Sequence, residues 1–506
     1  TGVFHILEHS VLCGSKRFPV KEPFVDLIKS SMQTFLNAMT FDDKTLYPVA
    51  STNEQDLYNL MDVYLDAVFH PNIYAKRQIF EQEGWHYELE GEDGLTHNGV
   101  VFNEMKGALS DANSVLYDEV QASLFPDTCY SFESGGTPAA IPTLTYEGFL
   151  DEHRRHYRTD NSYIILYGDL DIDRALAFLD GRYLSPVAAE QAERDAAREA
   201  AGLKPLLPRE IERQEPVVAA HRRHEMATAP ENACAACGYV VGESGDRVRV
   251  MAVEILLDAL FGSNEAPLKR RLLDAGLAHD VHAFVSDAVL QPFAMVQLQM
   301  PSEGAGERLA DVLADEVRAL VDGGFDHDLV EAALSHAEFQ MREHDMGVAD
   351  GVANAMISLS GWLYDDDAAM AYLRYEETFA QLRAKLEEGY FDQLAVEVFC
   401  EGGHRASVEI VPVEAVADDD SAARLAEMGR TLTDGDRDRI AAEVALLREL
   451  QEAPDAPEAI ATLPRLGIAD IDDAPVAPAY ALDESTPLAC MRHEVATRGI
   501  AYAYRY

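Results

Sequence analysis

The 506-residue sequence predicts an α+β protein that contains two copies of one helix-and-sheet unit, with sheets rich in antiparallel strands. The duplication is predicted by two pairs of similar stretches. HILEHSVLCGS, residues 5–15, is matched by VEILLDALFGS, residues 253–263, and LTYEGFLDEHRRHYRTDNSYIILYG near residue 144 is matched by YLRYEETFAQLRAKLEEGYFDQLAVEVF near residue 372. A charged helical pair after residue 414 adds a hairpin linker to the two units.

Changes in composition divide the chain into five segments. They are a first unit, a connector, a second unit, a helical hairpin and the start of a third unit, over residues 1–185, 186–225, 226–414, 415–475 and 476–506. The connector AAEQAERDAAREAAGLKPLLPRE is rich in Ala, Glu and Arg and then in Pro, which predicts a helix followed by an extended linker. The hairpin carries Ile440, Val444 and Leu447 on one face, and Pro454 and Pro457 break it.

The stretch HILEH places three polar side chains on one face of the first helix. His5 and His9 are four residues apart and Glu8 lies beside them, whereas most apolar neighbours point to the other sides. Two neutral imidazoles at this spacing can hold a tetrahedral zinc ion, and an adjacent carboxylate can take a proton from a zinc-bound water. The order H-x-x-E-H is that of the inverted zinc peptidases. The five residues alone leave a second interpretation open, an amphipathic helix whose polar face carries two histidines by chance.

The second copy of the helix lacks this polar face. When the Gly-Ser pairs at the ends of the two matching stretches are aligned, Val253, Leu256 and Leu257 replace the two histidines and the glutamate. The sequence therefore predicts that the helix recurs as a core helix without metal ligands.

A catalytic zinc site needs a third protein ligand and keeps one position open. GVVFNEMKG offers Glu104, in a helical stretch that Asn98 and Gly99 open. Without the two histidines, Glu104 would be an ordinary solvated helix carboxylate. Cys13, four residues beyond His9, would indicate a closed structural site if it supplied a fourth ligand.

Together these stretches resemble the pitrilysin-type (M16) zinc metallopeptidases, specifically the presequence protease branch. The resemblance rests on HILEH, SMQTFLNAMTFDDKTLYPVASTNEQDLYNLMDVYLDAVFHP, EQEGWHYEL and GVVFNEMKG, and becomes thinner after about residue 173. It implies His5, His9 and Glu104 as ligands of a catalytic Zn²⁺, and Glu8 as the general base that activates a zinc-bound water. It also implies that the chain is the N-terminal half of a longer enzyme, truncated at both ends.

Substrate contacts follow from the same resemblance. QTFLNAMTF, residues 33–41, is expected to form a strand beside the zinc that accepts an extended peptide as an added strand, with Asn37 and Ala38 as contacts. An ordinary sheet strand with one polar residue is the alternative. Residues 134–136 match a flexible loop near the cleft, or a plain turn. The C-terminal half is expected to supply an Arg and a Tyr and to close a chamber around the peptide.

The composition limits the partners and the compartment. With 41 basic and 89 acidic residues, the formal net charge of −48 disfavours nucleic acid and anionic membranes, and attracts cationic ligands. No apolar run approaches the roughly 20 residues of a membrane helix. The six cysteines, including the lone pair Cys234 and Cys237, indicate neither a disulfide framework nor a zinc ribbon. The dispersed acidic residues are typical of salt-adapted proteins and predict a prokaryotic cytoplasm, with an organelle matrix as the alternative.

The sequence thus predicts a zinc metalloendopeptidase that degrades short unstructured peptides, such as basic targeting presequences. The alternative is a non-catalytic protein of the same fold that acts as a structural or partner subunit. Such proteins typically lose ligand or base positions, whereas all four positions are present here. Activity of this half alone remains an open question, because the other half is expected to complete the active site.

Overall fold

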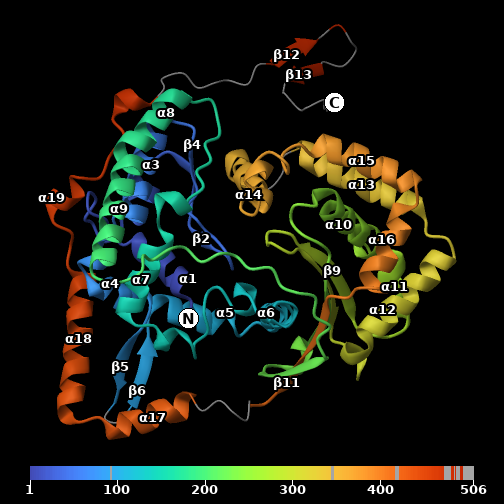
Figure 1. The fold of residues 1–506 in the computed structure, drawn as a ribbon, viewed down its shortest axis with the longest axis horizontal. Coiled ribbons are helices and arrows are strands. Elements are labelled where there is room, and N and C mark those ends of the chain that lie inside the picture. The colour runs from blue at the N-terminus through green and yellow to red at the C-terminus, as the bar shows by residue number, and fades with distance from the viewer. Residues whose placement is uncertain are drawn as a thin grey trace.

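The computed structural model describes residues 1–91, 94–343, 347–415, 421–471, 480–483, 485 and 490–493. Two units of helix and sheet lie side by side, and a helical hairpin runs from the second unit along the outer side of the first (Figure 1). The predicted α+β class is confirmed. No helix in these ranges has the length and apolar character that crossing a bilayer requires.

The first unit consists mainly of helices, with three short pairs of antiparallel strands. The pairs are β1 with β4, β2 with β3, and β5 with β6. The strands are β1 (Gln33–Leu36), β2 (Met39–Thr40), β3 (Thr45–Leu46), β4 (Val49–Ser51), β5 (His86–Glu90) and β6 (Gly94–Asn98). The helices are α1 (Val3–Val11), α2 (Pro23–Ser30), α3 (Glu54–Phe69), α4 (Arg77–Glu83), α5 (Val100–Ala108), α6 (Ala112–Leu124), α7 (Tyr146–His156), α8 (Ile172–Leu179) and α9 (Ser185–Ala200).

The second unit is built on a five-stranded sheet in the order β7-β11-β8-β10-β9, antiparallel except for the parallel pair β7 and β11. Its strands are β7 (Arg222–Ala227), β8 (Cys234–Val240), β9 (Asp280–Ser286), β10 (Phe293–Gln299) and β11 (Arg405–Val413). Its helices are α10 (Arg247–Phe261), α11 (Pro267–Asp274), α12 (Ala305–Asp322), α13 (His327–Glu343), α14 (Asp350–Trp362), α15 (Tyr375–Glu387) and α16 (Tyr390–Phe399). Because β7 begins at Arg222, this sheet starts inside the predicted connector.

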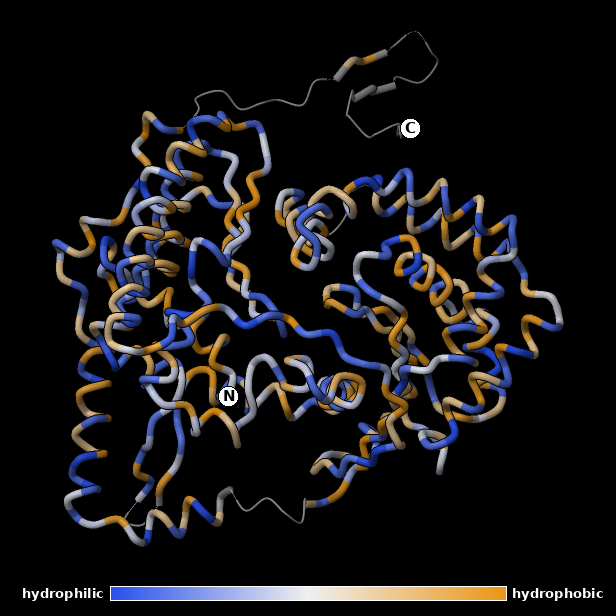
Figure 2. The backbone as a smooth tube through the Cα atoms, in the orientation of Figure 1, coloured by the Kyte–Doolittle hydropathy of each residue, from blue (hydrophilic) through white to orange (hydrophobic). Residues whose placement is uncertain are grey.

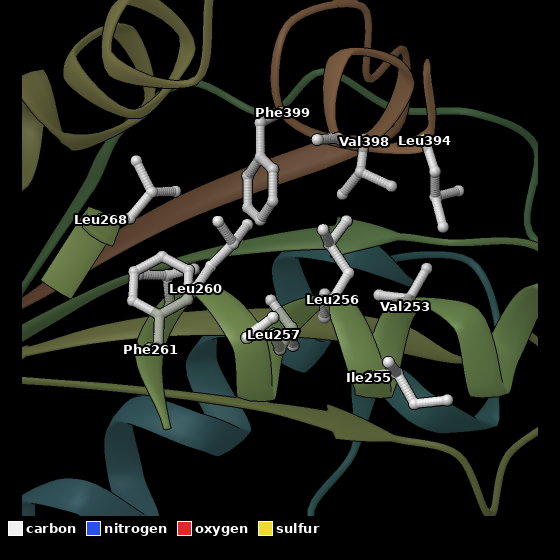
Figure 3. Close-up of a cluster of buried hydrophobic side chains, with 14 of the residues drawn as sticks. Val253, Ile255, Leu256, Leu257, Leu260, Phe261, Leu268, Leu394, Val398 and Phe399 are labelled. Atoms are coloured by element: carbon white, nitrogen blue, oxygen red, sulfur yellow. The ribbon is translucent and has the colours of Figure 1, made fainter. Parts of the chain in front are cut away.

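Helix α10 is the core helix of the second unit. Val253, Leu256 and Leu257, which stand where the first copy has its polar triad, are at most 2% exposed. Figure 3 shows them among side chains of α10 and α16, including Leu394 and Val398. Burial of these side chains stabilises the unit by about 1.5–3 kcal/mol each. The position that carries polar chemistry in α1 thus carries packing in α10.

The two units differ in their sheets. In the second unit β11 pairs with β7 and β8, which precede α10 in the sequence. Only two residues precede α1, and residues 162–168, the counterpart of β11 in the matched stretch after α7, form no strand. A strand needs a neighbour to satisfy its backbone groups, and no strand of the described first unit takes the place of β7 or β8.

A buried carboxylate joins the two units. Asp43, in the turn between β2 and β3, is fully buried and accepts hydrogen bonds of 2.6 Å from the hydroxyls of Tyr130 and Tyr364. Lys44 forms a 2.9 Å ion pair with Asp43 and donates to the carbonyl oxygen of Ala288 at 2.7 Å. Tyr364 and Ala288 belong to the second unit, so this network fixes the turn between the units.

The helical hairpin is formed by α17 (Ser421–Thr431) and α18 (Asp434–Glu452). Hydrophobic and hydrophilic residues alternate along α18, as expected of a helix with one apolar face (Figure 2). Its predicted apolar residues Ile440, Val444 and Leu447 are buried, the first two against Leu95 of β6. Lys21 donates hydrogen bonds to the last carbonyl groups of α18, including that of Leu450 at 2.7 Å. The hairpin is followed by α19 (Pro457–Ile460) and the strand pair β12 (Tyr480–Asp483) and β13 (Cys490–His493).

A buried histidine fastens α7 to the rest of the first unit. Nε2 of His153 donates to the carbonyl oxygen of Val68 at 2.9 Å, and the hydroxyl of Tyr74 donates to Nδ1 at 2.7 Å. This arrangement requires the neutral imidazole, because Nδ1 acts as the acceptor. Burial lowers the pKa of His153 to about 3.

We expect this histidine to make the fold sensitive to acid. Below about pH 6.5 the unfolded chain binds a proton that the folded chain excludes, so the free energy of unfolding falls as the pH decreases. The His153→Gln variant keeps one donor and one acceptor but cannot bind the proton. Between pH 7 and 5 the wild type should lose about 2 kcal/mol more than the variant, as measured by urea unfolding. Equal losses would show that His153 is not held neutral.

Candidate metal centre

Helix α1 presents its polar face toward α5 because its other faces are buried. Ile6, Leu7 and Val11 are completely buried, and α1 packs against α4, α7 and the β2–β3 pair. His5, Glu8 and His9 therefore remain together on one face, as the sequence predicts. The side chains of His5 and His9 are 12% and 25% exposed, respectively.

Glu104 of α5 meets the two histidines. Its Oε2 atom lies 3.8 Å from Nε2 of His5 and 3.7 Å from Nε2 of His9, and the imidazole centroids are 4.9 Å apart. The three side chains offer one ligand atom each within 4.8 Å of one another, and no other group of three such residues occurs in the described part of the chain. The structure thus brings the predicted ligands together.

The donor set fits zinc. Two ligand atoms at about 2.0–2.1 Å from a tetrahedral zinc ion lie about 3.3 Å apart, close to the separations between Glu104 and the histidines. Two imidazole nitrogens and one carboxylate oxygen are a known catalytic set, which leaves a fourth position open. The side chain of Glu104 is 52% exposed, so the open position can be reached from solvent.

Glu83, at the end of α4, supports His9 from behind. Its Oε2 atom lies 3.3 Å from Nδ1 of His9, which fixes the ring so that Nε2 points toward Glu104. Burial alone would lower the pKa of His9, but Glu83, followed by Glu8 and Glu104, raises it above its ordinary value. Glu83 lies in EQEGWHYEL, to which the sequence analysis assigned no role. Its distance from His9 in the sequence gives no spacing signal.

Cys13 does not join the ligands. Its thiol donates to the carbonyl oxygen of His9 and to Oε1 of Glu83, both at 3.5 Å. Burial, followed by the charge of Glu83, raises the pKa of Cys13 well above its ordinary value, so the thiol stays protonated. A closed site with a sulfur ligand is therefore not what the geometry offers.

Glu8 lies beside the ligand set but is not part of it. It is 8% exposed, and its charge acts on Tyr47 and Tyr157, whose hydroxyls are 2.7 Å apart. Burial, followed by Tyr157 and then Glu8, raises the pKa of Tyr47 well above its ordinary value. Glu8 is therefore held next to the ligands among neutral phenols, which leaves its carboxylate available for proton transfer.

Close contacts at two glycines place α5 and the neighbouring loop. A Cβ atom at Gly99 would lie 2.2 Å from the carbonyl oxygen of Gly84, the residue after Glu83. A Cβ atom at Gly135 would lie 2.3 Å from Sδ of Met105, the residue after Glu104. The absence of a side chain at these glycines permits the close approaches. The loop at residues 134–136 therefore lies against the helix of the third candidate ligand, close to the site as expected.

The predicted substrate strand is interrupted. The sequence predicts one strand over residues 33–41, whereas β1 ends at Leu36, β2 begins at Met39, and Asn37 and Ala38 lie between them. The backbone of Asn37 is used within the fold: its N–H donates to Pro48, and its carbonyl oxygen accepts from Tyr64. The chain changes partners here, from β4 to β3, which a sequence pattern with period two does not reveal.

The pair Cys234 and Cys237 is part of the core. Both residues lie in β8, three positions apart, and pack into different hydrophobic clusters on its two faces. Burial raises the pKa of each thiol to about 12. The structure therefore gives this pair no shared metal or redox site.

Two family models match separate parts of the chain. The model described as Peptidase M16 inactive domain matches residues 143–336, and a model for the domain associated with subfamily C of the M16 peptidases matches residues 412–506. Neither range includes α1 or α5, so neither match bears on the candidate metal ligands.

Relatives match almost the whole chain. "Protein HypA" of Clostridium perfringens is 38% identical over 477 residues, which cover 93% of this chain and 48% of that protein. "Presequence protease 1, chloroplastic/mitochondrial" of Arabidopsis thaliana is 35% identical over 518 residues, which cover 99% of this chain and 47% of that protein. The chain thus spans about half the length of the curated relatives it matches.

Solved structures share the fold at low identity. A protease from Helicobacter pylori has a TM-score of 0.55 at 16% identity, covering 81% of this chain and 90% of that chain. The first half of the periplasmic protease PqqL from Escherichia coli has a TM-score of 0.51 at 16% identity, covering 90% and 88%. Together with the family models and the relatives, this fold shows that the chain belongs to the M16 peptidase family, with presequence proteases among its relatives.

Proposed function

We propose that the chain is the zinc-binding half of a metalloendopeptidase. The observation that carries this proposal is the meeting of His5, His9 and Glu104, with Glu8 beside them and an accessible fourth position. A structural zinc site would use four protein ligands and commonly cysteine, which this group lacks. A non-catalytic subunit of the same fold is the alternative, and the complete set of ligands and base argues against it.

Each residue has a defined task in peptide hydrolysis. His5, His9 and Glu104 would hold the zinc ion. Zinc, when bound, supplies Lewis-acid chemistry that polarises the scissile carbonyl and acidifies water. Glu8 accepts a proton from the attacking water and donates it to the leaving amine, so that it returns to its starting state. Glu83 keeps Nε2 of His9 directed at the metal position.

The substrate class follows from access and charge. An extended, unfolded peptide can reach a site between packed units, whereas a folded protein cannot, and Asn37 and Ala38 lie near α1 through the neighbouring β2 strand. Burial and mutual repulsion raise the pKa of Asp42 to about 6 and of Asp118 to about 8, and Glu133 contributes to both shifts. A cationic peptide would relieve this repulsion, so we propose short basic peptides, such as targeting sequences, as substrates.

Further parts of the proposal concern what lies outside this chain. A C-terminal half would enclose the peptide in a chamber and complete the active site, in line with the half-length match to the relatives. The dispersed acidic surface is the basis for proposing a prokaryotic, salt-adapted cytoplasm as the compartment. Neither nucleic acid nor an anionic membrane is an expected partner.

The proposal is tested by metal content and cleavage. We expect one zinc per chain, removed by chelators and restored by Zn²⁺, and none in a variant with His5→Ala and His9→Ala. Cleavage of quenched fluorescent peptides should require zinc and should weaken with salt for a basic peptide more than for a neutral one. The assay is run for this chain alone and with a separately expressed C-terminal half of "Protein HypA". Zinc binding without cleavage in either form would favour the non-catalytic alternative.

A further inference from the structure

Helix α18 of the linker hairpin is connected to the metal centre through side chains that lie outside the ligand set. The hairpin packs on the β5–β6 pair, with Ile440 and Val444 of α18 buried against Leu95, and α18 also packs against α4. The β5–β6 pair runs directly into α5, which carries Glu104, and α4 carries Glu83. The linker therefore touches both elements that arrange the site.

Three groups of polar contacts lead from α18 to α5. The guanidinium group of Arg448 donates to Oε1 of Glu88 in β5. The other carboxylate oxygen of Glu88 accepts from Nδ2 of Asn98 at 2.7 Å. Oδ1 of Asn98 in turn accepts from the backbone N–H of Gly99 at 2.9 Å and from Nδ2 of Asn103 at 2.7 Å. These contacts hold the first turn of α5, and Glu104 is the next residue.

Glu104 depends on this support more than the histidines do. His5 and His9 lie on a helix whose apolar faces are buried, whereas the side chain of Glu104 is half exposed. Its position is therefore set by the placement of α5. A small rotation at the start of α5 would move the carboxylate away from the histidines, and ligand placement within about 0.5 Å matters for a metal centre.

We propose that Arg448 and Glu88 are positioning residues for the third metal ligand, so that docking of the linker hairpin sets the zinc affinity. The inference rests on the proposed function, because it assumes that His5, His9 and Glu104 hold zinc. The ion pair itself is 64% exposed on the arginine side and 24% on the glutamate side, so it adds little to overall stability. Its effect is directional: it orients the carboxylate that binds Asn98.

The linker also connects the second unit to whatever follows residue 471. A displacement of α18 would withdraw Arg448 from Glu88 and release the side chain of Asn98. The metal site would then respond to the position of the linker without any contact between the linker and the ligands. This gives α18 a regulatory role beyond that of a spacer.

The test measures zinc affinity by competition with a chromophoric chelator, using the full chain. Arg448→Ala should weaken zinc binding by about threefold to tenfold, less than the 10–100-fold typical of a direct partner of a ligand. Glu88→Ala should have a larger effect, because it also removes the acceptor for Asn98. The double variant should bind like Glu88→Ala alone, since both residues act through one path. Arg448→Lys, which restores a cation, should recover part of the loss.

Arg439→Ala is the matched control. Arg439 is an exposed arginine of the same helix that, among the described residues, pairs only with Asp436 and Glu443 of α18, so its removal should leave the zinc affinity unchanged. Thermal unfolding of the metal-free variants checks that the fold is retained. Wild-type zinc affinity in both Arg448→Ala and Glu88→Ala overturns the inference alone. Absence of zinc binding by the unaltered chain overturns the inference together with the proposed function.

Discussion

Replacing Glu8 by Gln is expected to abolish peptide hydrolysis while leaving one zinc bound per chain. The amide keeps the size of the side chain but cannot accept a proton at neutral pH. General acid–base catalysis contributes about 10²–10⁴-fold, so kcat should fall by at least that range. Because Glu8 is not among the three candidate ligands, the zinc content should stay the same. The measurement compares metal content and turnover in whichever form of the enzyme, alone or with the C-terminal half, is active.

Glu147→Gln provides the comparison for this variant. Glu147 is an exposed residue in the first turn of α7, a helix that packs against α1, so the substitution changes the same charge near the same elements. It should retain activity. If Glu8→Gln hydrolyses peptides at the rate of the unaltered protein, Glu8 is not the base. If it loses its zinc as well, the residue belongs to the metal site instead.

Replacing Glu83 by Gln is expected to weaken zinc binding by about 10–100-fold, as found for residues that orient a metal-bound histidine. The amide oxygen can still accept from Nδ1 of His9, but the negative charge that makes the imidazole a stronger ligand is removed. Cys13 and Gln82 also donate to Glu83, so the amide must share its single oxygen among three donors. Chelator competition measures the affinity, and the rate at saturating zinc should change less than the affinity does.

Glu81→Gln separates this effect from a general loss of charge on α4. Glu81 lies two residues before Glu83 and pairs with Arg77 on the outer side of the helix, at 2.9 Å. Its replacement should leave the zinc affinity unchanged. Equal affinity losses in the two variants would mean that the net charge of the helix, and not the hydrogen bond to His9, governs metal binding.

Much of the fold and the candidate ligand set could be predicted from local patterns. His5, Glu8 and His9 share a face because the helical period is fixed, whatever the surrounding structure. The same period shows that Val253, Leu256 and Leu257 belong to a core helix, and that Ile440, Val444 and Leu447 form the apolar face of α18. These features depend on residues close in the sequence, and such information is local.

Contacts between distant residues could be decided only by the tertiary structure. The support of His9 by Glu83 joins residues 74 positions apart, and the path from Arg448 to Glu88 spans 360 positions. The break between β1 and β2 depends on which strands lie beside them, because backbone groups pair with neighbours that the local pattern does not name. The sequence by itself determined which side chains can carry the chemistry. The packing of α4, α5 and α18 around α1 decided which residues hold those side chains in place.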